Sequence, residues 1–373
     1  MTSTLPRRNP VRDRPWLLLG LVLACNDQGA VETTGGETAQ TGDATAVDDA
    51  DADETASPQT SAADASDGTS NATPGDSSAS NPGSDNGSVD DDGGEGDDTS
   101  PPPLNEPNLP TITGVCPDFF VTLENQLAHE LVFAPEGITP RQVRLYMDES
   151  VVDLDGPVVF YWHGTGGNPT EAVYGLGMGG IAGIRAAGGI VAVPYADEAS
   201  GTYPWTPVGG NIDHDNLLAD EIIACAQDQV GIDAHRIHSA GFSAGGIHTV
   251  TMSTRRAAYL ASVVSYSGGE FGPVLAPDTD PDNLFAAMSV HGGPDDVFQG
   301  AVSFQEPSEH YAELLQMSGR FALLCDHGAG HSVPTDIQTS VMRFFADHPW
   351  GTTPSPYENG LPPEFSHGYC TIP

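Results

Sequence analysis

A serine set between glycines is the first group in the sequence that could do chemistry. Gly241-Phe-Ser-Ala-Gly245 has the pattern G-x-S-x-G, whose small flanking residues permit a sharp turn. It follows an apolar run that predicts a strand over 236–241 and precedes a segment that predicts a helix from Ala244. A strand, a tight turn and a helix would present the Ser243 hydroxyl as a nucleophile. The alternative is an ordinary glycine-rich turn, because so short a pattern also arises by chance.

A nucleophilic serine needs a base, and the base needs a carboxylate that orients it. Two loops after predicted strands supply such groups in the chain order Ser, acid, His. We predict His331 as the base and Asp295 as the orienting acid, with Asp296 as the alternative. His327 competes with His331, but the Gly-Ala-Gly stretch between them carries His331 further from the strand end.

The negative oxygen formed in acyl transfer needs hydrogen-bond donors. The stretch His163-Gly-Thr-Gly-Gly167 follows a predicted strand over 157–162, and its small residues leave backbone N–H groups accessible. We predict the N–H groups of Thr165 and Ala244 as the two donors. We interpret His163 as a structural hydrogen-bonding residue rather than a catalyst.

The elements around these motifs alternate between strands and helices. Short apolar runs predict strands over 143–147, 157–162, 190–194, 236–241, 261–266, 284–291 and 320–325. Helical patterns cover 216–230, a segment from 244, 307–317 and 334–346. Continuous apolar strands between helices predict an α/β fold with a mostly parallel central sheet and helices on both faces. In such sheets chemistry lies beyond the carboxyl ends of the strands, where the three motifs fall.

The motifs together resemble the α/β-hydrolases, most closely the extracellular polyhydroxybutyrate depolymerase and feruloyl or acetylxylan esterase group. The likeness covers about residues 155–345 and is most specific over Ile232–Gly246, around the serine. His238 and the acid loop Gly-Gly-Pro-Asp-Asp depart from that group's usual pattern. The resemblance implies hydrolysis of a carboxylic ester through an acyl-enzyme, without a cofactor or metal.

The remainder of the chain has a different composition. The 12 arginines and 52 acidic residues give a net charge of −40, which excludes a general nucleic-acid binder because phosphate contacts need clustered cations. A basic start and a short apolar run over 16–24 predict an export signal. The run ending in Cys25 resembles a bacterial lipobox, which implies a lipid anchor on Cys25 and a place in the cell envelope or outside the cell. An ordinary secretory signal is the alternative.

The domain organisation follows from the same shift in composition. We predict a signal over 1–25, a disordered acidic linker over 26–110 and a catalytic domain over 111–373. The linker holds 20 acidic and no basic residues, so it has too little apolar surface to fold. The domain's four cysteines predict two disulfides in an exported protein, with three pairings open. These cysteines are Cys116, Cys225, Cys325 and Cys370.

Other patterns are weaker. Gly175–Gly180 matches G-x-G-x-x-G without a strand directly before it, so we interpret it as a loop. Residues 278–282 are spaced like calcium ligands but lack the rest of that motif. The cluster of Asp326, His327 and His331 has no zinc-binding helix beside it. Of the aromatic residues, Tyr203, Trp205 and Phe298 are candidates for lining a pocket, and Trp162 is a candidate core residue.

We therefore expect a monomeric serine esterase. A serine peptidase of the same fold and a non-catalytic binding module remain open alternatives, and so does the identity of the ester.

Overall fold

A computed structural model describes residues 106–120, 127–197, 200, 203–205, 213–272, 280 and 282–373. The predicted signal, Cys25 and nearly all of the predicted linker lie outside these residues. Within the described part, Asn108 N–H donates to Ala258 C=O over 2.8 Å. The described chain therefore joins the domain a few residues before the predicted boundary at 111.

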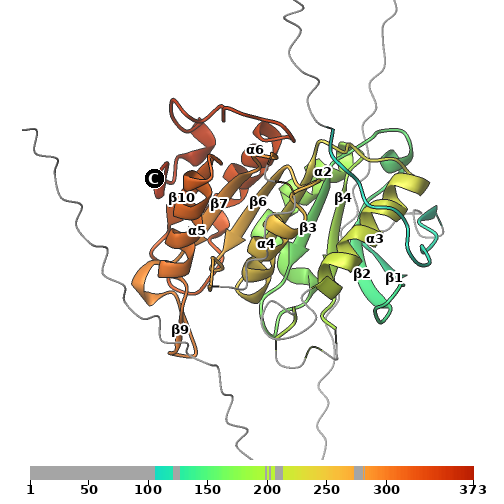
Figure 1. Ribbon diagram of the computed structural model, residues 1–373, viewed down its shortest axis with the longest axis horizontal. Helices are drawn as coiled ribbons and strands as arrows, with labels where there is room; N and C mark the ends of the chain where they lie inside the picture. Colours follow the sequence, from blue (N-terminus) through green and yellow to red (C-terminus); the bar gives the residue numbers. More distant parts are fainter. Residues whose placement is uncertain are drawn as a thin grey trace, which may run out of the picture. The chain divides into compact units, whose positions relative to one another are not determined.

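A nine-stranded sheet forms the centre of the domain, in the order β1-β2-β4-β3-β5-β6-β7-β10-β11. Its strands are β1 (His129–Phe133), β2 (Arg141–Tyr146), β3 (Val158–Trp162), β4 (Ile190–Pro194), β5 (Ile237–Phe242), β6 (Ser262–Tyr266), β7 (Ala286–His291), β10 (Ala322–Asp326) and β11 (Cys370–Thr371). The six strands from β4 to β10 in this order are parallel, whereas β1, β2 and β11 pair in the antiparallel sense. A small hairpin of β8 (Val297–Phe298) and β9 (Val302–Ser303) forms a separate sheet, seen at the lower edge of Figure 1.

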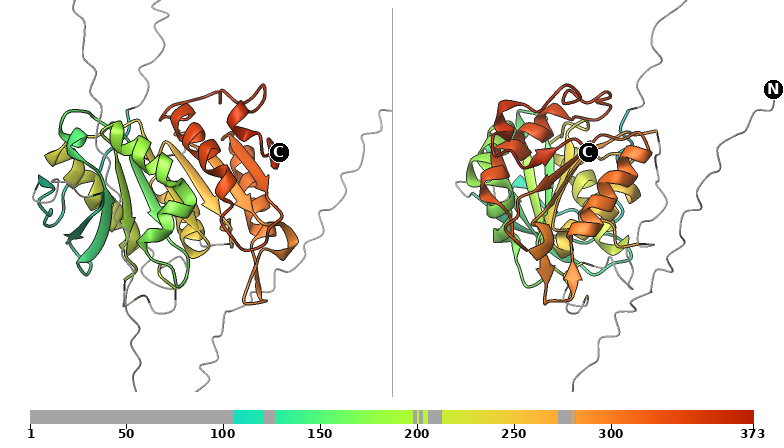
Figure 2. Two further views of the ribbon diagram at one scale, coloured as in Figure 1. Left: turned by 180° about the vertical axis from the view of Figure 1, so that it is seen from behind. Right: turned by 90° about the vertical axis from the view of Figure 1, so that its left-hand side faces the viewer.

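Helices cover both faces of the sheet. They are α1 (Ala172–Leu176), α2 (Met178–Ala186), α3 (Asp213–Gln229), α4 (Ala244–Arg255), α5 (Gln305–Met317) and α6 (Gln338–Asp347). One core cluster joins α3, α4 and α5 to one face of the sheet, and a second joins α1, α2 and α6 to the other. Figure 1 shows α3, α4 and α5 in front of the strands, and Figure 2 shows the sheet from behind.

Strand β3 shows why the sheet is covered on both sides. Its five residues are all buried, with Phe160 and Trp162 in one core cluster and Val159 and Tyr161 in the other. A strand with no polar face can be stable only between two layers. The predicted α/β fold with a mostly parallel sheet is confirmed.

The predicted strands and helices appear within a few residues of their expected ends, with one clear error. We interpreted Gly175–Gly180 as a loop, but these residues end α1 and begin α2. Gly177, with φ of 75°, separates the two helices, and side chains at Gly177 and Gly180 would contact Gln338 and Met342. Gly177 therefore ends one helix and begins the next, and Gly180 allows α2 to pack closely against α6.

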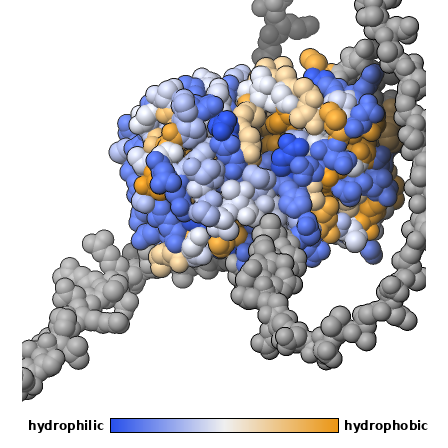
Figure 3. Space-filling view, turned by 90° about the horizontal axis from the view of Figure 1, so that it is seen from above, coloured by the Kyte–Doolittle hydropathy of each residue, from blue (hydrophilic) through white to orange (hydrophobic). Residues whose placement is uncertain are grey.

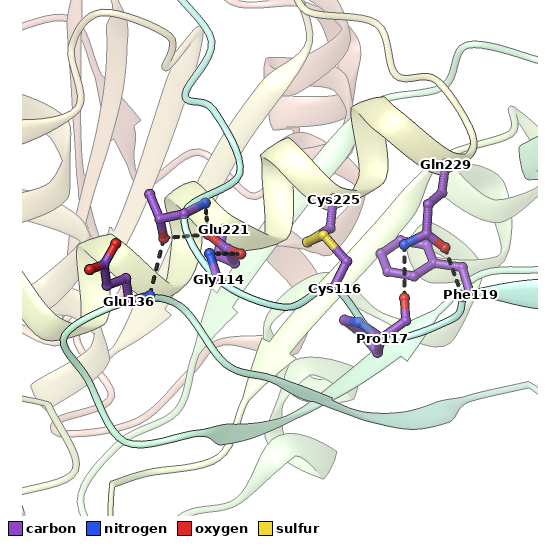
Figure 4. Close-up of a disulfide and its surroundings, with 9 residues drawn as sticks. Gly114, Cys116, Pro117, Phe119, Glu136, Glu221, Cys225 and Gln229 are labelled. Atoms are coloured by element: carbon purple, nitrogen blue, oxygen red, sulfur yellow. Dashed lines mark hydrogen bonds between the residues drawn. A yellow bond between two sulfur atoms is a disulfide. The ribbon is translucent and has the colours of Figure 1, made fainter.

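Two disulfides connect distant segments, as predicted. Cys116 pairs with Cys225 of α3, and Cys325 of β10 pairs with Cys370 of β11. Beside the first, Glu221 accepts hydrogen bonds from Thr113 N–H, Thr113 Oγ1 and Gly114 N–H (Figure 4). The proximity of Cys116, Glu221 and Cys225 is thus explained by a disulfide and a satisfied carboxylate that attach the start of the domain to α3.

Several short secondary elements complete the described chain. Short 3₁₀ helices lie at Glu149–Val152, Pro169–Glu171, Gly293–Asp295, Thr335–Ile337 and Pro363–Phe365. None of the helices in the described ranges is both long and apolar enough to span a bilayer. Figure 3, which views the molecule from above Figure 1, shows hydrophilic and hydrophobic residues interspersed.

Candidate active site

Three side chains from separate parts of the sheet meet in one chain of hydrogen bonds. Ser243 Oγ lies 3.0 Å from His331 Nε2, and His331 Nδ1 lies 2.7 Å from Asp296 Oδ1. An ionised carboxylate only accepts hydrogen bonds, so Nδ1 carries the proton and Nε2 is left to accept from the serine hydroxyl. Since these residues follow β5, β10 and β7, they meet beyond the carboxyl ends of parallel strands.

Ser243 lies on the sharp turn between β5 and α4. Its φ of 55° and ψ of −117° are unusual for a residue with a side chain and store backbone strain. Its N–H donates to Tyr266 C=O, and its C=O accepts from Ile247 N–H. Side chains at Gly241 and Gly245 would strike backbone atoms of Gly245 and Trp162. The prediction that glycines are needed at these two positions is confirmed.

The carboxylate that contacts His331 is Asp296, and the first choice, Asp295, is wrong as its partner. Asp295 ends the 3₁₀ turn Gly293–Asp295 with its side chain exposed, whereas Asp296 is fully buried. A bond from Asp296 N–H to Gly293 C=O closes the turn, which points one of the adjacent carboxylates outward and the other inward. The sequence order alone cannot show which of two consecutive residues such a turn buries.

Asp296 is held by donors on both of its oxygens. Oδ2 accepts from Ser267 Oγ over 2.8 Å and from Gly292 N–H over 2.9 Å. Burial alone would raise the pKa of Asp296, but hydrogen bonds from His331, Gly292 and Ser267 outweigh it and lower the pKa. The carboxylate therefore stays ionised and keeps His331 in one tautomer and orientation. Ser267, with φ of 43°, was not identified from the sequence, where no motif marks it.

Aromatic rings surround the His331 imidazole. Phe304 stacks on it with ring centres 4.6 Å apart, Phe242 lies at 4.8 Å and Phe298 at 5.8 Å. Phe298 is in the β8–β9 hairpin, which a bond from Phe304 N–H to Asp296 C=O closes at its base. Asp296, Phe298 and Phe304 thus belong to one hairpin segment, whereas Phe242 comes from β5. The predicted place of Phe298 near the site is consistent with this contact.

The loop His163–Gly167 lies between β3 and the 3₁₀ turn that leads to α1. Gly167 N–H donates to Gly164 C=O over 2.9 Å, and Gly166 has φ of 77°, as in a turn that needs glycine at its third residue. Thr165 is the second residue of that turn. Ala244 is the first residue of α4, so its N–H has no acceptor within the helix. The roles of Thr165 and Ala244 as donors to the negative oxygen stay predictions.

Trp205 packs against His163, the first residue of this loop. The indole N–H of Trp205 donates to His163 C=O over 2.7 Å, and its ring meets Trp162 edge to face at 5.0 Å. Trp205 is buried and supports the loop from below. Burial lowers the pKa of His163, which favours the neutral structural role predicted for it.

The two sequence patterns that resemble metal sites have different outcomes. The side chains of Asp326, His327 and His331 make ordinary hydrogen bonds, and the stretch 278–282 lies mostly outside the described residues. Asp326 Oδ1 accepts from Gly328 N–H, and His327 Nδ1 accepts from Ala329 N–H, while His331 faces Asp296 and Ser243. The predicted preference for His331 over His327 agrees with this geometry.

One carboxylate near the site was missed altogether. Glu171 Oε1 accepts from Gly164 N–H over 2.9 Å and lies 3.3 Å from Tyr161 Oη. Burial raises the pKa of Glu171 to about 7, against lowering by its hydrogen bonds to Gly164 and Tyr161 and by the charge of His331. No sequence pattern singles out this residue, because its importance comes from the fold of the loop before it.

Comparison with known proteins gives a fold and no closer identity. No family model matches the chain, and no curated protein matches it. The native structure of a protein named sOPH aligns with a TM-score of 0.51 and 16% identity, over 69% of this chain and 96% of that one. A complex of a pOPH variant with DMSO aligns with a TM-score of 0.50 and 15% identity, over 70% of this chain and 94% of that one. A ferulic acid esterase aligns with a TM-score of 0.46 and 14% identity, over 59% of this chain and 97% of that one. With the sheet order and the two helical layers described above, the alignments with sOPH and pOPH establish that the chain has the α/β-hydrolase fold.

Proposed function

We propose that the protein is a serine hydrolase of carboxylic esters. The observation that carries this proposal is the chain of contacts from Ser243 Oγ through His331 to Asp296, with distances of 3.0 and 2.7 Å. A hydroxyl bonded to an imidazole that a buried carboxylate orients is the arrangement that acyl transfer needs. Its position on a strained turn at a helix start supports the same role for Ser243.

The reaction proceeds through an acyl-enzyme. Ser243 Oγ attacks the ester carbonyl carbon while its proton passes to His331 Nε2. The negative carbonyl oxygen is held by the N–H groups of Thr165 and Ala244, and Asp296 stabilises the imidazolium. His331 then protonates the leaving alcohol as the ester C–O bond breaks. Water, deprotonated by His331, cleaves the acyl–serine bond and restores the hydroxyl.

The substrate is an ester with an apolar or aromatic part. Phe242 and Phe298, both partly exposed, lie beside the imidazole, and such rings favour flat or apolar groups. Together with the resemblance of the sequence motifs, this supports polyesters and feruloyl or acetyl esters of polysaccharides as the substrate class.

The protein acts outside the cytoplasm. Two disulfides within the catalytic domain support this placement, because such bonds persist in oxidising compartments. The basic and apolar start of the chain and Cys25 support export with a lipid anchor, and the acidic linker would separate a monomeric domain from the membrane.

The test compares esters with an amide. The purified full-length protein should hydrolyse p-nitrophenyl acetate and butyrate, and Ser243→Ala should lose this activity to near the uncatalysed rate. A peptide p-nitroanilide distinguishes the peptidase alternative: faster cleavage of the anilide than of the esters would contradict an esterase. A folded wild type that cleaves neither would favour the binding module and overturn the proposal.

A further inference from the structure

Glu171 holds the loop that is predicted to bind the negative oxygen. The residue ends the 3₁₀ turn Pro169–Glu171, directly after that loop. Its Oε1 accepts from the backbone N–H of Gly164 over 2.9 Å. The carboxylate therefore contacts the residue immediately before Thr165, from the side chain of a residue only seven positions further along the chain.

The second oxygen of Glu171 lies against the other end of the same loop. A side chain on Gly167 would place its Cβ 2.5 Å from Glu171 Oε2, so the glycine leaves the space that the carboxylate occupies. Gly164 and Gly167 are also joined by the bond that closes the turn, 2.9 Å long. The carboxylate thus contacts both ends of the turn whose second residue is Thr165.

Few charged or titratable groups face this carboxylate within the described chain. Tyr161 Oη of β3 lies 3.3 Å from Oε1, and burial raises the pKa of Tyr161 well above its usual value, so it stays neutral. Tyr266 of β6 lies beyond Tyr161 and donates to Gly175 C=O. His331, from the loop after β10, interacts with Glu171 through charge. Within the described chain, the groups that interact with the Glu171 carboxylate are therefore Gly164, Tyr161 and His331.

We propose that Glu171 is a positioning residue of the candidate active site: its carboxyl group fixes the His163–Gly167 turn so that the Thr165 N–H is available to the substrate oxygen. This inference rests on the proposed ester hydrolysis. Because burial raises the pKa of Glu171 to about 7, the carboxyl group gains its charge near neutral pH. The charged carboxylate accepts the hydrogen bond from the Gly164 N–H more strongly than the neutral acid does, so the ionisation of Glu171 should appear in the pH profile.

Two substitutions separate anchoring from charge. Glu171→Gln keeps an oxygen for the Gly164 N–H but cannot ionise, and Glu171→Ala removes both. Glu149→Gln, at an exposed acidic residue of another 3₁₀ helix, is the matched control. We would measure kcat/KM for p-nitrophenyl acetate from pH 5 to 9, with near-UV circular dichroism to verify the fold.

The Glu171→Gln profile should differ from those of the wild type and Glu149→Gln around pH 7, where the ionisation of Glu171 is lost. Glu171→Ala should lose about 10²-fold at every pH, comparable to losing one oxyanion donor. A Glu171→Gln profile that superimposes on that of the wild type, or a Glu171→Ala rate within about threefold of wild type, would overturn the inference. If Glu171→Ala does not fold, the Glu171→Gln profile decides.

The two proposals fail in different ways. If Ser243→Ala keeps the wild-type rate, or if the wild type hydrolyses no ester, the proposed function fails. If hydrolysis depends on Ser243 while the pH profiles with and without Glu171 coincide, only the role of Glu171 is lost.

Discussion

The backbone of the 3₁₀ turn Gly293–Asp295 determines which aspartate side chain contacts His331. Asp296 is buried and takes hydrogen bonds from three partners, whereas its neighbour Asp295 points to solvent. The residue types and their order along the chain left Asp295 and Asp296 as the two candidates for the acid that orients His331. Choosing between them required the backbone of the turn, because consecutive residues there face opposite directions.

Substituting each of these two acids in turn tests the assignment. Asp296→Asn should lower kcat for p-nitrophenyl butyrate by about 10⁴-fold, since the amide no longer fixes the His331 tautomer or stabilises the imidazolium. Asp295→Asn should stay within about threefold of the wild type. The reverse ranking of the two variants would mean that Asp295 serves the histidine in solution.

At the level of elements, the turn between β5 and α4 is specified most completely by its own sequence. The apolar run before it, the glycines within it and the helical pattern after it all agree, and both the turn and its position are as predicted. The strands buried on both faces were predicted for the same reason, since their apolar runs leave little ambiguity.

Other elements carry weaker local signals. The β8–β9 hairpin has only two residues in each strand, and β1 is a short strand at the sheet edge. In α2 the residues Gly179, Gly180 and Gly183 lower helix propensity, and close packing against α6 compensates for this cost. Such elements depend on contacts with distant segments, which local patterns do not contain.

Two glycine substitutions distinguish a required glycine from a tolerated one. Gly245→Ala should destabilise the fold by about 3 kcal/mol, because its Cβ would overlap the Trp162 carbonyl oxygen in the middle of the sheet. Gly179→Ala should be neutral or stabilising by up to about 1 kcal/mol, because its Cβ would meet nothing within 4 Å. Urea unfolding of both variants measures the difference, and equal stabilities would contradict the account of the turn.

At the scale of the whole molecule, several buried histidines link folding to pH. Burial lowers the pKa of His238 to about 3 and those of His248 and His348 to about 4. All three lie inside the domain, away from solvent. In the unfolded chain they would titrate near the ordinary value of about 6.5.

Stability should therefore fall in mild acid. Between about pH 6.5 and pH 4 the unfolded state binds protons that these histidines refuse in the folded state, and each costs about 1.4 kcal/mol per pH unit. Urea unfolding from pH 7.5 to 4.5 measures the slope. His348→Gln, which removes one of the three buried imidazoles, should reduce the slope. A stability that rises toward pH 4.5 would contradict this account.

The contacts between residues 243, 331 and 296 are the basis of the proposed ester hydrolysis. Labelling with a fluorophosphonate probe, which bonds covalently to an activated serine hydroxyl, tests them most directly. The wild type should label at Ser243, as mapped by peptide mass spectrometry, and labelling should be abolished in Ser243→Ala and strongly slowed in His331→Ala. A folded wild type that does not react, or one that reacts equally well without Ser243, would contradict the proposed active site.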